Sequence, residues 1–181
     1  GAKPQKYING LRELIKAKDQ FNSKQQKEWD ATHTEDEPYK PQKLREAIIC
    51  SGERDALCCR SLGYMPLWFN SETYRIDEGE VREIMKHVDT LYNIPDIDET
   101  GIRKGTELAL SFIDIRTMWL PDWLGNYRDN RGKPRKDLRD WMELRHTKKE
   151  FKFLMQMAMP AKFWKTTINK KSGDVRHSID T

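Results

Sequence analysis

Long apolar runs are absent from this sequence of 181 residues, and its charges of opposite sign nearly balance. The longest apolar stretches are far shorter than the roughly 20 residues of a membrane-spanning helix, so we expect no membrane association. The first ten residues, GAKPQKYING, lack the apolar region of a signal peptide, which predicts a cytosolic context. Because 33 Lys and Arg face 29 Asp and Glu, the distribution of charge says more about partners than the net charge of +4.

Cysteine is scarce, at three residues, and no Cys-x-x-Cys pair occurs. An odd number of cysteines without such a pair argues against a disulfide framework and agrees with a reducing compartment. We interpret Cys50, Cys58 and Cys59 as small buried apolar residues. The four histidines are scattered along the chain, so the sequence offers no Cys and His set with the spacing of a zinc site.

Apolar runs alternate with amphipathic segments through the middle of the chain. Short apolar runs predict four strands, at 44–50, 65–70, 89–96 and 115–123. The segments between them carry apolar residues at helical spacing and predict three helices, at 54–64, 77–88 and 98–112. Strands that alternate with helices form βαβ units, so we expect an α/β core with a four-stranded parallel sheet and helices on both of its faces.

Helical extensions are expected on both sides of this core. Residues 1–43 predict one or two amphipathic helices and then a linker with two prolines and an acidic cluster. A basic loop and a helix from about Asp137 complete the central unit, residues 44–145. Residues 146–181 are expected to continue as a helix to about Trp164, and the tail after it suits either a hairpin or the start of a following domain.

Acidic side chains follow each predicted strand, and they are densest after the third. In the segment PDIDETG, residues 95–101, Asp96 and Asp98 are two positions apart, so their carboxylates point to one side of an extended chain. Ligands of open parallel sheets bind beyond the carboxyl ends of the strands. Paired carboxylates there suit Mg²⁺, which takes one or two of them together with water and phosphate. The same residues also suit an ordinary turn that caps the next helix.

Two further groups of residues favour the metal interpretation. The turn after the first strand, SGERD, brings Glu53 and Asp55 to the same edge of the sheet. After the fourth strand comes a basic segment with six cationic side chains, Arg128, Arg131, Lys133, Arg135, Lys136 and Arg139. Clustered cations of this kind suit contacts with nucleic-acid phosphates. A solvent-exposed loop explains them equally well.

The order of these motifs resembles the toprim domain of primase-helicases from phages and mobile elements, related to bacterial primases. The matching segments, within about residues 44–145, are AIICSGERDALCCRSLGY, PDIDETGIRKGTELA, WLPDW and RKDLRDWMEL. The resemblance implies a Rossmann-like toprim fold and Mg²⁺-dependent nucleotidyl transfer, with Mn²⁺ as a substitute ion. It implies that Asp96 and Asp98 are both metal ligands and catalytic. It also implies single-stranded DNA template, nucleotides and the other domains of a longer primase-helicase as partners.

One position departs from the family pattern. The resemblance implies a catalytic glutamate directly before Gly52, and this chain has Ser51 there. A hydroxyl group cannot act as a carboxylate base or as an anionic metal ligand. Either Glu53 takes over as a catalytic residue, or the domain retains only a binding role.

Several functions stay open on the sequence alone. The first is a primase module that makes RNA primers in the DNA replication of a phage or mobile element, with its template guided by Arg128, Arg131, Lys133, Arg135 and Lys136. The second is a catalytically degenerate toprim domain that binds nucleic acid or serves as a scaffold. The third is a toprim nuclease or a topoisomerase; a topoisomerase needs a tyrosine nucleophile, for which Tyr64 and Tyr92 are badly placed inside core elements. A receiver-like phosphoacceptor domain fits the pattern of acids and lysine less well.

Overall fold

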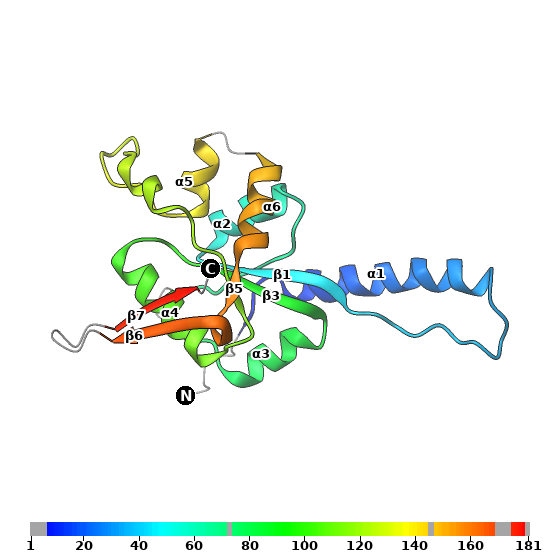
Figure 1. The fold of residues 1–181 in the computed structure, drawn as a ribbon. Helices are drawn as coiled ribbons and strands as arrows, with labels where there is room; N and C mark the ends of the chain where they lie inside the picture. Colours follow the sequence, from blue (N-terminus) through cyan, green and yellow to red (C-terminus); the bar gives the residue numbers. More distant parts are fainter. Residues whose placement is uncertain (1–6, 72–73, 145–146, 169–174, 180–181) are drawn as a thin grey trace, which may run out of the picture.

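A five-stranded sheet forms the centre of the molecule in the computed structural model, which describes residues 7–71, 74–144, 147–168 and 175–179 (Figure 1). Its strands, in the order β2-β1-β3-β4-β5 across the sheet, are β1 (Leu44–Cys50), β2 (Pro66–Leu67), β3 (Val88–Ile94), β4 (Arg116–Thr117) and β5 (Met159–Pro160). The first four run parallel, and β5 pairs antiparallel with β4. The expectation of a purely parallel, four-stranded sheet is therefore corrected to a mixed sheet of five strands.

Helices cover both faces of this sheet. They are α1 (Leu11–Asp30), α2 (Glu53–Ser61), α3 (Glu78–Met85), α4 (Glu99–Ser111), α5 (Leu138–Glu143) and α6 (Lys148–Met157), with 3-10 turns η1 (Asp122–Asn126) and η2 (Ala161–Phe163). Alternate residues of a strand point to opposite faces, and β1 feeds two apolar clusters in this way. Ile48 and Cys50 pack with α2, α5 and α6, whereas Ala47 and Ile49 pack with α1 and α3.

The start of α1 belongs to the core. Leu14 is fully buried in the cluster that α3 and the sheet share. Asn9 exchanges backbone hydrogen bonds with Trp68, at 3.0 and 3.2 Å. Gly10 has φ 86°, and a Cβ there would lie 2.2 Å from the carbonyl oxygen of Pro66, so only glycine fits. The rest of α1 extends away from the sheet as a long arm (Figure 1).

The chain after α6 differs from the expected long helix. Ala158 is extended, and Pro160 has no N–H to continue a helix, so α6 ends at Met157 and the chain enters β5. Beyond η2, β6 (Trp164–Ile168) and β7 (Val175–Ile179) pair antiparallel, as the hairpin alternative predicts. The expected turn at KKSGD lies outside the described residues.

No helix among the described residues is both long and apolar enough to cross a bilayer. Cys50 and Cys59 are buried free thiols, as expected, whereas Cys58 is half-buried.

Candidate metal and nucleic-acid site

The turn after β3 positions the two aspartates of the DxD pair. Asp98 is the N-cap of α4, and its Oδ1 accepts a hydrogen bond of 2.8 Å from the backbone N–H of Gly101. This bond satisfies one of the free donors at the start of the helix, which is what the acidic-turn interpretation predicts. The second oxygen of Asp98, Oδ2, is not used in the cap. The side chain of Asp98 can therefore cap α4 and bind an ion at the same time.

Two glycines of α4 allow the helix to lie directly against this turn. A Cβ on Gly101 would lie 2.3 Å from the carbonyl oxygen of Asp96. A Cβ on Gly105 would lie 2.7 Å from the Pro95 ring and 3.0 Å from the Trp119 ring. Because neither contact tolerates an added methyl group, the backbone that carries Asp96 and Asp98 is tightly enclosed.

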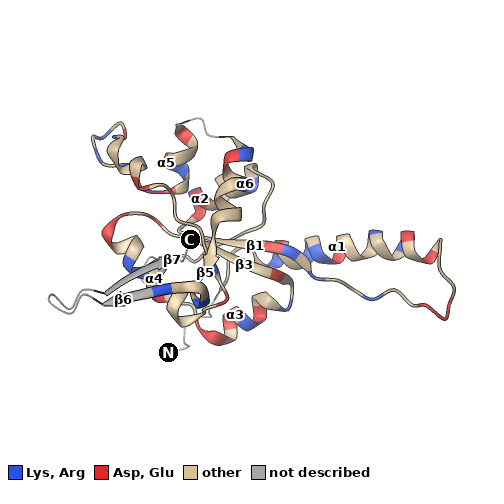
Figure 2. Ribbon diagram, in the orientation of Figure 1, with Lys and Arg blue, Asp and Glu red and all other residues tan. Residues whose placement is uncertain are grey.

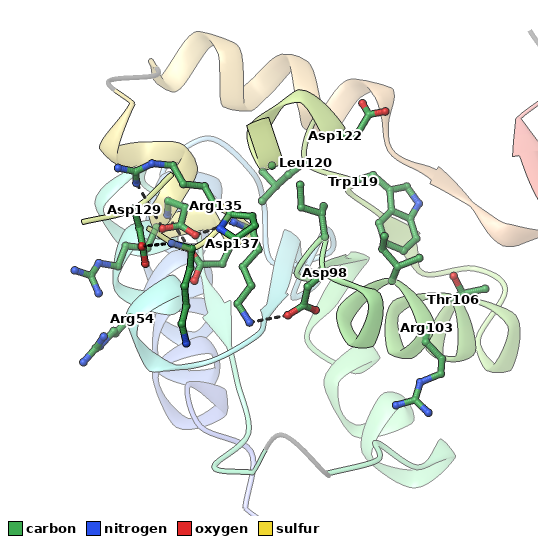
Figure 3. A pocket seen from close by; sticks show the side chains of 18 of the residues that line it. Arg54, Asp98, Arg103, Thr106, Trp119, Leu120, Asp122, Asp129, Arg135 and Asp137 are labelled. Atoms are coloured by element: carbon green, nitrogen blue, oxygen red, sulfur yellow. Dashed lines mark hydrogen bonds and ion pairs between the residues drawn. The ribbon is translucent and has the colours of Figure 1, made fainter. Parts of the chain in front are cut away.

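A lysine from a distant segment meets both aspartates. The Nζ of Lys136 lies 2.7 Å from Asp98 Oδ2 and 3.4 Å from Asp96 Oδ2; Figure 3 draws the shorter contact as a dashed line to Asp98. Burial alone would raise the pKa of Asp98, but hydrogen bonds from Lys136 and Gly101 outweigh it and hold that pKa below its usual value. The hydrogen bond to Asp98 in turn raises the pKa of Lys136, against the effect of burial.

Two further carboxyl groups, those of Asp55 and Asp137, lie near this ion pair and interact with Asp96. Asp55 is 4% exposed, and its Oδ1 accepts a hydrogen bond of 3.2 Å from the backbone N–H of Arg139. Burial, together with the charges of Asp137 and Asp96, raises the pKa of Asp55 to about 7. Burial also raises the pKa of Asp137, which caps α5 through the N–H of Asp140. The crowded carboxyl groups destabilise each other's charged forms, so a bound cation would stabilise them.

The donor set fits a magnesium ion with few protein ligands. Asp96 Oδ1 is buried and has no hydrogen-bond partner in the described part of the chain. An unpaired buried acceptor is costly, and a cation would satisfy it. Within the described residues, no three Asp, Glu, His or Cys side chains are grouped to hold one ion. Asp96 and Asp98 alone would therefore be the protein ligands, as is common for Mg²⁺.

The turn after β1 contributes less than the sequence predicts. Ser51 is exposed, and its Oγ donates a long hydrogen bond of 3.4 Å to the carbonyl oxygen of Ile94. Glu53 is exposed in the first turn of α2, whereas Asp55, two residues later, is the buried acid of this turn. Asp55 and Asp137 therefore join the predicted pair Asp96 and Asp98. The sequence signal for Asp55 is its place beside Ala56 and Cys59, the buried residues of α2.

The basic segment contains cations that are held in ion pairs and cations that are exposed to solvent. Arg135 is 12% exposed and pairs with Glu143 at 2.6 Å and with Asp140 at 3.6 Å. Arg131 pairs with Asp129 at 3.3 Å but stays largely exposed. The structure therefore places Arg128, Arg131 and Lys133 at the surface, whereas Arg135 and Lys136 are occupied in ion pairs.

Asp98 lines a groove of about 1270 Å³ between α4, η1 and the basic segment (Figure 3). Apolar and aromatic side chains line it, including Ile102, Leu110 and Trp119. Ile102 and Leu110 are each nearly half exposed, which is unusual for large apolar side chains. Figure 2 shows acidic residues gathered at the start of α4, where Asp98 lines the groove.

Comparison with known proteins gives the fold a name. No family model matches the sequence, and no curated protein matches it. Among solved structures, the DnaG catalytic core and the DnaG primase catalytic domain bound to single-stranded DNA each have a TM-score of 0.56 at 15% sequence identity. The E. coli primase catalytic core has the same values. The fold of this chain is therefore similar to that of the DnaG primase catalytic core.

This similarity has a defined extent. The match covers 88% of this chain but only 42% of the DnaG catalytic core, so the chain spans less than half the length of that protein. At 15% identity the similarity concerns the fold alone. This similarity of fold agrees with the resemblance that the sequence motifs carry.

Proposed function

We propose that this chain is the nucleotidyl-transfer module of a DNA primase, which joins nucleotides into RNA primers on single-stranded DNA during replication. The observation that carries the proposal is the packing of Asp96 and Asp98 at the carboxyl end of β3, beside an open groove, on a primase-type toprim fold. The sequence motifs add a phage or mobile element as the source and other domains of a longer primase-helicase as partners.

Asp96 and Asp98 would hold Mg²⁺, or Mn²⁺ in its place. Two observations support this assignment: Asp96 Oδ1 has no partner among the residues that the structure describes, and Asp96 is crowded by Asp55 and Asp137. When bound, the ion would stabilise negative charge on the phosphate that is transferred. The protein contributes a rigid turn that orients both carboxylates, since Gly101 lets α4 pack against it.

Single-stranded DNA would follow the basic segment and the groove. The exposed cations Arg128, Arg131 and Lys133 suit phosphates, and Trp119 with its apolar neighbours suits bases. One of the similar structures is a DnaG primase domain bound to single-stranded DNA, which supports this choice of partner. Replacing Arg128 and Lys133 together with alanine should weaken binding to a single strand about threefold or more and lower the slope of its salt dependence by about one or two.

A control variant that also removes two positive charges distinguishes this interface from general electrostatic attraction. Lys24 and Lys27 are exposed on the arm of α1, away from the basic segment. We expect Lys24→Ala with Lys27→Ala to retain native affinity. Equal losses in the two variants, measured by fluorescence anisotropy at several salt concentrations, would contradict the proposed interface.

The catalytic proposal is tested by primer synthesis on a single-stranded template with Mg²⁺ or Mn²⁺. We expect slow dinucleotide formation by the native chain, a loss of about a hundredfold or more in Asp96→Asn, and faster synthesis in Ser51→Glu, which restores the carboxylate of the family pattern. Activity in the variant Ser51→Glu alone would favour the second candidate, a degenerate domain that only binds nucleic acid. The exposed Ser51 is the observation behind that candidate. Strand cleavage that needs no nucleotides and is lost in Asp96→Asn would instead indicate a nuclease.

A further inference from the structure

Lys136 stands out among the basic residues because its ammonium group contacts the two carboxylates assigned to the metal ion. It lies within 3.4 Å of Oδ2 of both Asp96 and Asp98, although it follows Asp98 by 38 residues in the chain. A lysine whose task was to bind nucleic acid would gain nothing from this placement, since the ion pairs must break before it can contact a phosphate.

The backbone around Lys136 holds this arrangement in place. Its carbonyl oxygen accepts a hydrogen bond of 2.8 Å from the N–H of Ile97, the residue between the two aspartates. Its own N–H donates a hydrogen bond of 2.8 Å to Oδ2 of Asp140. The segment before α5 is thus joined directly to the DxD turn. Exposed ion pairs are usually weak because two mobile side chains must be ordered, and here two backbone bonds reduce that cost.

The charges of this cluster are only partly balanced. One ammonium group faces two carboxylates, and Asp96 Oδ1 remains without a partner among the described residues. A divalent ion would therefore still be attracted to the pair. It would, however, need Oδ2 of Asp98, the oxygen that the helix cap leaves free and that Lys136 contacts at 2.7 Å, and two cations cannot share this oxygen closely without strong repulsion.

We propose that Lys136 is a built-in counter-cation that regulates the metal site. Its ammonium group keeps Asp96 and Asp98 together in the absence of a divalent ion and withdraws when one binds. Lys136 therefore raises the ion concentration at which the site fills. This inference rests on the proposed metal site, and it assigns Lys136 a task other than the phosphate contacts that the sequence predicts.

The test is a Mn²⁺ titration at low ionic strength, followed by electron paramagnetic resonance of free Mn²⁺. Lys136→Met keeps a side chain of similar length without the charge, and Lys133→Met removes an exposed charge from the same basic segment. We expect Lys136→Met to bind Mn²⁺ about three- to tenfold more tightly than the native chain and Lys133→Met to stay within about twofold, because Lys136 is 45% exposed and solvent screens its charge. Equal or weaker binding by Lys136→Met would overturn the proposal.

The variant Asp96→Asn with Asp98→Asn separates two kinds of failure. If it loses Mn²⁺ binding while Lys136→Met binds as the native chain does, the metal site stands and only the role of Lys136 is wrong. If it binds Mn²⁺ as well as the native chain, the metal site and the counter-cation are both wrong.

A second measurement needs no folded Lys136→Met protein. In the native chain labelled with ¹⁵N, we expect the Lys136 ammonium group, which contacts two carboxylates, to exchange its protons slowly enough to give a side-chain NMR signal. Lys136→Arg identifies that signal by its absence. We expect added Mg²⁺ to remove the signal with the same midpoint as metal binding. A signal that persists at saturating Mg²⁺ would show that Lys136 stays in place and would overturn the proposal.

Discussion

The turns after β1 and β3 begin side by side, yet they are built in opposite ways. Cys50 at the end of β1 pairs with Ile94 at the end of β3, so both turns leave the same edge of the sheet. After β1 the chain is exposed at Ser51, and a Cβ on Gly52 would meet nothing within 4 Å. After β3 the chain is enclosed by α4 and by the segment that carries Lys136.

This difference indicates where the site is preorganised. The β3 turn holds its two carboxylates through a helix cap, a close backbone contact and an ion pair. The β1 turn is exposed at Ser51, the position where the family pattern places a carboxylate. One half of the proposed metal site is therefore rigid, and the other half can accept a larger side chain without rearrangement.

The largest expected effect compares one glycine from each turn. Gly101→Ala would push a methyl group into the backbone of Asp96 and should lower the free energy of unfolding by about 2–3 kcal/mol. Gly52→Ala should change it by less than about 0.5 kcal/mol, because Gly52 has extended backbone with φ −173° and free space around it. Urea denaturation measures both. Similar losses in the two variants would contradict the contrast between the turns.

The second effect is a pH-dependent change in the free energy of unfolding, and it comes from Asp55, the buried acid that follows β1. The native state raises the pKa of Asp55 from 3.8 to about 7, so between these values it binds a proton that the unfolded chain releases. The contribution of Asp55 to stability therefore falls as pH rises through this window. Asp55→Asn removes that titration, and the free energy of unfolding of the variant relative to native should rise by about 2 kcal/mol from pH 5 to pH 8.

Chemical denaturation across that pH range, in buffer without divalent ions, measures the effect of Asp55→Asn. The hydrogen bond from the N–H of Arg139 is retained, since the amide oxygen of asparagine also accepts it. Added Mg²⁺ should shrink the pH-dependent difference, because a nearby cation favours the charged carboxylate. A difference that does not change with pH would show that Asp55 has no raised pKa.

The smallest expected effect is the change in Mg²⁺ affinity when Ser51, the exposed residue of the β1 turn, is replaced. Ser51→Glu adds a carboxylate beside the end of β3 and should tighten Mg²⁺ binding about tenfold, or about 1.4 kcal/mol. The exposed Glu53 should matter less, and Glu53→Gln should change binding less than about twofold. Calorimetric titration checks both variants. A large loss in Glu53→Gln would instead support the prediction from the sequence that Glu53 replaces the missing glutamate.

The central strands and their order in the chain could be predicted from the sequence, because apolar periodicity is a local signal. The runs that contain β1 and β3 are correctly placed, and the acids after β3 follow from the rule that sites lie at the carboxyl ends of parallel strands. The strand β5 was missed. It has two residues, and it pairs with β4 across some 40 positions of sequence, which no periodicity encodes.

The sequence alone could not predict which side chains contact one another, because tertiary packing decides these contacts. Lys136 and Arg135 belong to one basic run, but tertiary packing brings Lys136 to Asp98 and Arg135 to Glu143. The pattern of the first turn of α2 did not distinguish Glu53 from Asp55, since both are acids at a helix start. Only the packing of α5 against α2 decides that Asp55 is the buried one.

The most direct test of the metal site is Mn²⁺-induced broadening of backbone amide NMR signals. We expect the signals of Ile97, Asp98 and Lys136 to broaden first, and that of Trp29, far along the arm of α1, to stay sharp. The variant Asp96→Asn with Asp98→Asn should lose this local broadening. Broadening that persists in this variant, or that centres on the acidic stretch at 35–37, would contradict a metal site at the end of β3.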